Sequence, residues 1–230
     1  MDDVDPRASK LILAHAAASA GLNLAGSART RGLRRTAVFF ALGIGLPAMG
    51  ELLVTGRLGL LRHRTRPRVK GAPVAVLLDW YSVIHGAYTA AERVLARLPL
   101  SETSRRRALP PVAALVATSL DLILDPTGLE AGLWEWNADG AYASEVSGAN
   151  GRRGVPLINY LGWLTLVADV AFVYGRVAGD EDPGDDRLPV FLLLPFYLAA
   201  AVWSVKSRRP RYLLRSALFP VALYASLKRG

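Results

Sequence analysis

The stretch that decides the fold reads Leu188-Pro-Val-Phe-Leu-Leu-Leu-Pro-Phe-Tyr-Leu-Ala-Ala-Ala-Val-Trp-Ser-Val205, eighteen residues without a charged side chain. An apolar stretch of about 18 or more residues can cross the ~30 Å hydrocarbon core of a bilayer as a helix. Residues 36–54 contain only one charge, Glu51, and residues 155–175 contain only Asp169. The sequence therefore predicts a polytopic membrane protein.

The composition agrees with this reading because charged and apolar residues are segregated along the chain. Hydrophobic residues make up 52% of the chain and charged residues 20%, and the mean hydropathy is +0.25. The net charge of +9 comes largely from short basic clusters between apolar stretches, at residues 29–35, 62–70, 105–107 and 208–211. Basic residues at the ends of membrane spans bind anionic headgroups. We therefore expect the lipid bilayer, and no nucleic acid, as the partner of these clusters.

The pattern of apolar stretches predicts an all-α helical bundle of about seven transmembrane helices in a single membrane domain, residues 1–230. We expect the cell membrane as its location, with multiple passes. The predicted spans are residues 11–28, 36–54, 72–94, 108–124, 155–177, 188–205 and 212–227. The first is weak because it is alanine-rich, and the last is short and contains Arg215.

The longest polar stretch is an insertion at residues 137–154, rich in Gly, Ala, Ser and Asn. A loop of this length inside a compact bundle is either a lid or disordered. Since it connects two stretches with candidate site residues, we predict a mobile cover over a cavity mouth.

The most informative polar residues are two aspartates, Asp121 and Asp125, in a predicted span. Their spacing of four places both carboxylates on one helix face. Pro126 follows, so we expect the helix to end there. Two carboxylates this close in a low dielectric cannot both ionise cheaply, which predicts a proton-holding acid beside a carboxylate. The alternative is structural: one aspartate caps the next turn and the other bonds to a neighbouring helix.

Aromatic residues follow this pair closely. Trp134 and Trp136 flank Glu135 and predict either an interfacial aromatic belt or a pocket whose indole faces stabilise a carbocation. Asn159 and Trp163, four residues apart, share a face of the next predicted helix.

Two more acids lie in predicted spans, Glu51 and Asp79. Each either pairs with an arginine or His85 of another helix or takes part in catalysis. The chain has no cysteine, and His15, His63 and His85 lack metal-ligand spacing. We therefore expect no metal and no cofactor.

Three motifs in residues 119–166 carry a family resemblance. They are Asp121-Leu-Ile-Leu-Asp-Pro126, the Trp134-x-Trp136 pair, and Gly154-Val-Pro156 with Asn159 and Gly162-Trp163. In this order they resemble the membrane carotenoid 1,2-hydratase family, whose members hydrate bisanhydrobacterioruberin or γ-carotene and are often labelled "carotenoid biosynthesis protein". A looser upstream match comprises Glu51 with Thr55-Gly56, then Gly71-Ala-Pro73 and Trp80.

The resemblance implies cofactor-free, acid-catalysed addition of water to a terminal isoprenoid C=C of an acyclic carotenoid end group, through a tertiary carbocation. The partner would be a lipophilic isoprenoid, carotenoid or polyprenyl. We expect the catalytic residues to be Asp121, Asp125, Glu51 and Asp79, and the substrate-binding residues to be Trp80, Trp134, Trp136, Asn159, Tyr160 and Trp163.

Two alternatives remain open from the sequence. If water were excluded, a neighbouring alkene would capture the same cation, and the protein would be a membrane terpene or carotenoid cyclase. A non-enzymatic membrane carrier, whose acids serve ion or proton passage, is the second alternative. The insertion and the arginine run after Leu58-Gly-Leu-Leu61 depart from the family pattern in regions expected to shape substrate access.

Overall fold

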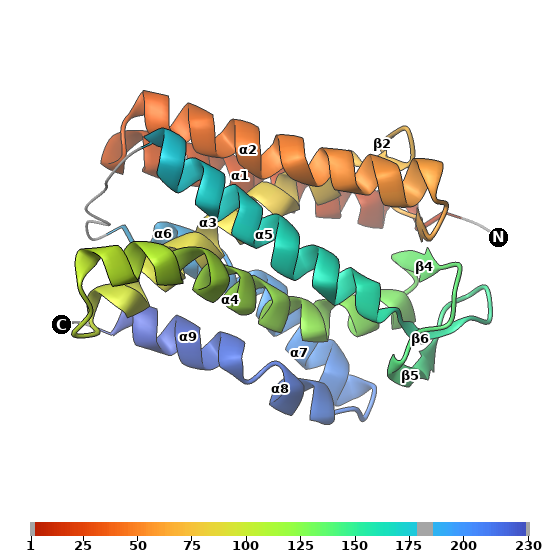
Figure 1. The fold of residues 1–230 in the computed structure, drawn as a ribbon. Helices are drawn as coiled ribbons and strands as arrows, with labels where there is room; N and C mark the ends of the chain where they lie inside the picture. Colours follow the sequence, from red (N-terminus) through yellow and green to blue (C-terminus); the bar gives the residue numbers. More distant parts are fainter. Residues whose placement is uncertain (1–2, 179–185, 229–230) are drawn as a thin grey trace.

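The computed structural model describes residues 3–178 and 186–228, and it shows an elongated helical bundle with short strands gathered at one end (Figure 1). The helices are α1 (Pro6–Thr30), α2 (Leu33–Glu51) with a π-helical continuation η1 (Leu52–Arg57), α3 (Val74–Ala96), α4 (Glu102–Glu130), α5 (Leu157–Ala178), α6 (Leu188–Phe191), α7 (Leu194–Lys206), α8 (Arg211–Arg215) and α9 (Leu218–Leu227). The strands are β1 (Leu61–His63), β2 (Arg68–Val69), β3 (Ala72–Pro73), β4 (Trp134–Trp136), β5 (Tyr142–Ser147) and β6 (Arg153–Val155).

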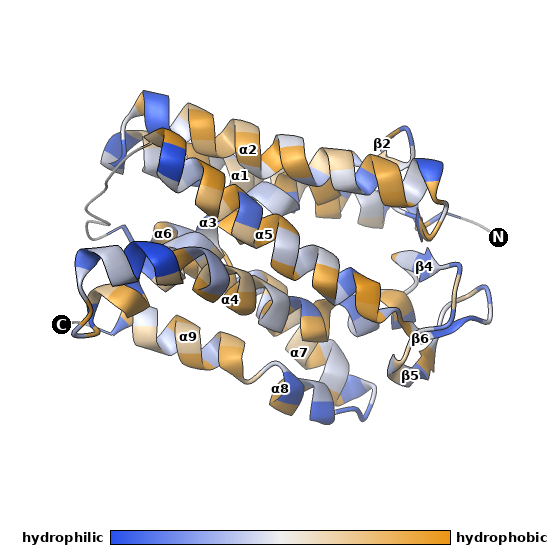
Figure 2. Ribbon diagram, viewed as in Figure 1, coloured by the Kyte–Doolittle hydropathy of each residue, from blue (hydrophilic) through white to orange (hydrophobic). Residues whose placement is uncertain are grey.

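The expected all-α membrane bundle is confirmed, but the count of seven spans is not. In the described part of the chain, five helical segments are long and apolar enough to cross a membrane. They are Pro6–Thr30, Leu33–Arg57, Glu102–Glu130, Leu157–Ala178 and Leu188–Lys206. Figure 2 shows that much of α2, α5 and α9 is hydrophobic, whereas the most hydrophilic residues gather toward the two ends of the bundle. The outward apolar faces are those that a bilayer would cover.

Helix α3, the central helix of the bundle, is not among these five segments. Its polar residues lower its hydropathy, and other helices bury them: Ser82, His85 and Thr89 are fully buried. It packs against α1, α2, α4, α6 and α9. Small residues permit this close packing, since a Cβ at Gly86 would lie 2.6 Å from the Pro189 carbonyl oxygen. The seventh predicted span is divided in the structure between α8 and α9.

Helix α4 does not end at Pro126, so that expectation is wrong. The helix continues to Glu130. Proline lacks the N–H that would bond to the carbonyl four residues earlier. That carbonyl, of Leu122, instead accepts a 2.7 Å hydrogen bond from the Tyr142 hydroxyl. A side chain from outside the helix therefore satisfies the group that proline leaves free.

The polar insertion, for which we predict a mobile cover, contains regular secondary structure. Strands β5 and β6 pair antiparallel within it, with Tyr142 opposite Val155 and Ser147 opposite Arg153. Its inward residues Ala143 and Val146 are buried, and β5 contacts α4. These two residues are three apart, and an irregularity in β5, where the register shifts between Tyr142 and Ser147 and Ala143 has a φ of 53°, allows both to be buried.

Candidate functional site

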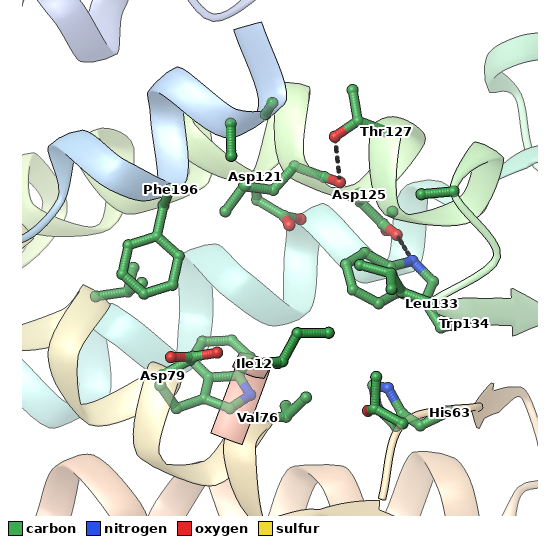
Figure 3. Close-up of a pocket in the computed structure, with 18 of the residues that line it drawn as sticks. Ile12, His63, Val76, Asp79, Asp121, Asp125, Thr127, Leu133, Trp134 and Phe196 are labelled. Carbon is green, nitrogen blue, oxygen red and sulfur yellow. Dashed lines mark hydrogen bonds between the residues drawn. The ribbon is translucent and has the colours of Figure 1, made fainter. Parts of the chain in front are cut away.

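A cavity of about 540 Å³ lies between helices α1 to α5 and α7, and β1 and β4 close one end. All five tryptophans of the chain line it: Trp80, Trp134, Trp136, Trp163 and Trp203. Most of the remaining lining is apolar, apart from a few carboxylates, histidines and hydroxyls (Figure 3). Such a lining suits a hydrocarbon ligand that must meet a few placed polar groups.

The acid pair lies in the wall formed by α4. The Asn159 side-chain amide, from α5, donates 2.7 Å hydrogen bonds both to Asp121 Oδ2 and to Asp125 Oδ2. Asp125 Oδ1 accepts two further bonds, from Trp134 Nε1 at 2.5 Å and from Trp136 Nε1 at 3.3 Å. Both aspartates are buried. The sequence spacing that predicted a shared face is therefore realised at a cavity wall.

The pairing of β1 with β4 places the two indoles. In this register His63 lies opposite Trp134 and Leu61 lies opposite Trp136. Side chains alternate along a strand, so the intervening Glu135 turns to the other face of β4. There its Oε1 lies 3.6 Å from Arg64 Nε.

A glycine in α4 makes room for one of these indoles. A Cβ at Gly128 would lie 2.1 Å from Trp134 Cζ2, a distance that no side chain tolerates. Glycine at this position therefore lets the indole lie against the helix that carries the acids.

A second polar group in the cavity is centred on Glu51, at the end of α2. Its Oε2 lies 3.0 Å from His63 Nε2, and its Oε1 accepts a 3.0 Å hydrogen bond from Trp80 Nε1. The Trp80 ring lies against Trp163, with centroids 4.0 Å apart. Glu51 thus pairs with His63, whereas His85 bonds to Asn23 elsewhere in the bundle.

Asp79 stands apart from both groups. Figure 3 draws it on the side away from Asp121 and Asp125, toward Phe196. Its Oδ1 is buried and has no hydrogen-bond partner among the described residues, and the same holds for His63 Nδ1. Buried polar atoms are normally satisfied by protein or by ordered water. Water inside the cavity would satisfy both atoms.

Nine of the ten site residues predicted from sequence line this cavity, and Tyr160 does not. Tyr160 is buried, and its ring meets Tyr142 edge-on at 5.0 Å, toward the β5–β6 hairpin. One residue further along a helix is about 100° further around it, so Tyr160 lies on a different side of α5 from Asn159. The expected substrate contact of Tyr160 stays a prediction, and the cavity lining does not support it.

Sequence reasoning missed several residues that line the cavity. His63 lies within an arginine run, and the turn of the chain after η1 brings it back to Glu51, twelve residues earlier. Thr127, His15 and Phe196 also line the cavity without belonging to a recognisable motif. No motif or spacing in the sequence singles out His63, which stands between Arg62 and Arg64.

The fold and the cavity define an integral membrane protein that holds carboxylates inside an apolar, tryptophan-lined cavity. The family model described as carotenoid biosynthesis protein matches residues 9–223, which include every residue of the cavity lining. The chain therefore belongs to the carotenoid biosynthesis protein family. Comparison with curated proteins gives no match, and neither does comparison with solved structures.

Proposed function

We propose that the protein adds water to a terminal isoprenoid double bond of an acyclic carotenoid, by acid catalysis at the cell membrane. The observation that carries this proposal is the hydrogen-bonded group of Asp121, Asp125 and Asn159 beside two indoles in a cavity otherwise suited to hydrocarbon. Family membership supports a role in carotenoid biosynthesis. The reaction needs a strong acid, a surface that stabilises a cation, and a positioned water.

The hydrogen bonds distinguish the two aspartates. Asp125 accepts three N–H bonds, from Trp134, Trp136 and Asn159, whereas Asp121 accepts one. N–H donors stabilise the carboxylate form. We assign Asp125 as the anionic partner and Asp121 as the proton donor. In the first step the Asp121 O–H bond breaks and a C–H bond forms at the less substituted alkene carbon.

The tertiary cation that results faces indole rings and carboxylates. Aromatic faces attract cations, most strongly when water is excluded. The stacked rings of Trp80 and Trp163 lie in one part of the lining, and Trp134 and Trp136 lie beside Asp125. The cation is thus held between negative and aromatic groups.

Water then captures the cation. A water held at His63 Nδ1 forms the C–O bond and loses a proton to that nitrogen, while Glu51 stabilises the charged ring through His63 Nε2. The proton returns through water to Asp121, so the cycle consumes one alkene and one water and yields a tertiary alcohol. This unpartnered nitrogen favours capture by water over capture by a second alkene, the cyclase reaction.

The test is expression in a lycopene-producing host, followed by mass analysis of the pigments. A product heavier than lycopene by one water supports the proposal. An isomer of unchanged mass means a cyclase. Unchanged pigment, with the protein shown to be in the membrane, contradicts both activities and favours the carrier.

A further inference from the structure

The cavity has an opening on the side of the bundle where α1 and α7 lie. Leu11 and His15 of α1 line the cavity and are exposed on the outside of the bundle, Leu11 to 72%. On α7, Ala199 and Trp203 line the cavity and are also exposed, Trp203 to 41%. Residues that belong both to the lining and to the outer surface mark an opening.

Helices α1 and α7 hardly pack on each other. Among the described residues, α1 packs on α2, α3 and α6, whereas α7 packs on α4 and α8. One ring contact bridges the gap, since His15 meets Phe196 edge-on with centroids 5.1 Å apart. This ring contact holds α1 and α7 together more weakly than the extended packing of a helix pair would.

The opening faces the lipid rather than water. His15 and Ala199 lie near the middle of two membrane-spanning segments, Pro6–Thr30 and Leu188–Lys206. Their exposed neighbours on α7, Leu198 and Val202, are apolar. An aqueous ligand would have to cross hydrocarbon to reach this opening, whereas a lipophilic one is already there.

The cavity is too small for a whole carotenoid. A sphere of its volume is about 10 Å across, a third of the ~30 Å hydrocarbon thickness that such a polyene spans when extended. The bound molecule must therefore leave most of its length outside the cavity.

We propose that the opening between α1 and α7, bridged by His15 and Phe196, is a lateral portal for a linear polyene. The end group passes through it from the bilayer to the acid pair, and the remaining chain stays in the lipid, against Leu11 and Trp203. The nature of the ligand rests on the proposed function. The position of the portal rests on the geometry alone.

The test uses the purified full-length protein in lipid nanodiscs, with lycopene as the probe. Since all five tryptophans line the cavity, energy transfer to bound lycopene will quench their fluorescence without any turnover. Ala199→Phe narrows the portal, and its matched control is Leu198→Phe, at an exposed neighbour outside the lining. We expect Ala199→Phe to weaken quenching and kcat/KM for lycopene by tenfold or more, and Leu198→Phe to match the wild type.

A second variant, expected to act in the direction opposite to Ala199→Phe, distinguishes a narrowed portal from damaged folding. His15→Ala removes the ring that bridges to Phe196 and should speed the onset of quenching several-fold. Damaged folding would instead slow the onset of quenching in both variants. Equal quenching by Ala199→Phe and Leu198→Phe, or no quenching of the wild type, would overturn the portal.

The same measurements separate the portal from the proposed function. Portal-dependent quenching without any hydrated product retains the portal and rejects the hydratase. Hydration that Ala199→Phe leaves unchanged retains the hydratase and rejects the portal.

Discussion

The Tyr142 hydroxyl donates a 2.7 Å hydrogen bond to the carbonyl oxygen of Leu122, the group that Pro126 leaves without its helical partner. Leu122 lies between the two aspartates of the cavity, and Tyr142 belongs to the polar insertion. The insertion thus braces the helix that carries the acids. None of residues 137–154, all of which the structure describes, lines the cavity.

Tyr142→Phe should destabilise the protein. Removing the hydroxyl leaves the Leu122 carbonyl, one turn before Pro126, without a partner, at a cost of roughly 1–3 kcal/mol. Thermal unfolding in a fixed detergent measures this loss. Tyr224→Phe, at a tyrosine that is 70% exposed on α9, is the control and should melt like the wild type.

Shortening the insertion distinguishes two roles for it: the mobile cover over the cavity mouth that the sequence predicts, and a structural support for α4. Replacing residues 139–152 by a short glycine linker removes β5 and its bond to Leu122. We expect lower thermal stability with near-normal turnover per folded molecule. Normal stability with altered substrate range would favour the mobile cover.

The acid pair should be indispensable. Asp121→Asn and Asp125→Asn should each reach the membrane at near-normal levels, yet each should cut product formation by roughly two orders of magnitude or more. Pigment analysis in the lycopene host measures both. Asp169→Asn, outside the cavity lining, should be mild. If both pair variants stayed active while Glu51→Gln or Asp79→Asn were inactive, the proton would come from α2 or α3.

Gly128→Ala should move an indole without touching an acid. The new Cβ would lie 2.1 Å from the Trp134 ring, so the ring must leave Asp125. We expect a loss of activity of about tenfold or more, the scale of a misplaced catalytic group, with a shift in tryptophan emission. Gly162→Ala is the matched control, because a Cβ there meets nothing within 4 Å. Equal effects of the two changes would refute the role given to Gly128.

The hairpin should loosen in acid. Burial raises the pKa of Glu145, but the hydrogen bond from the Tyr212 hydroxyl and the nearby Arg211 outweigh it, and the pKa lies below its ordinary value. A lowered pKa in the folded state contributes stability at pH values above the ordinary pKa, and the contribution disappears as the pH falls through the lowered value. The Arg211 ion pair, at 2.6 Å, is partly exposed, so we expect about 1 kcal/mol or less. Glu145→Gln should lower the melting temperature at pH 7 and leave it unchanged at pH 3.

Local patterns in the sequence were sufficient for several features of this molecule. Uncharged runs such as 188–205 predict membrane helices because length and hydropathy are properties of a single segment. The four-residue spacing of Asp121 and Asp125 predicts one shared face because helix geometry repeats every 3.6 residues. The motif order between residues 119 and 166 indicated the family that the match over residues 9–223 confirms.

The relationships between distant segments were decided only by the tertiary structure. The pairing of β1 with β4 brings His63 to Trp134 across about seventy residues. The continuation of α4 past Pro126 depends on a hydroxyl from the insertion, and the buried polar face of α3 depends on the helices packed around it. A hydrogen bond, a buried side chain and a cavity each require atoms from separate segments. Their positions therefore follow from the packing of the whole chain, whereas hydropathy and helical spacing can be read from one segment alone.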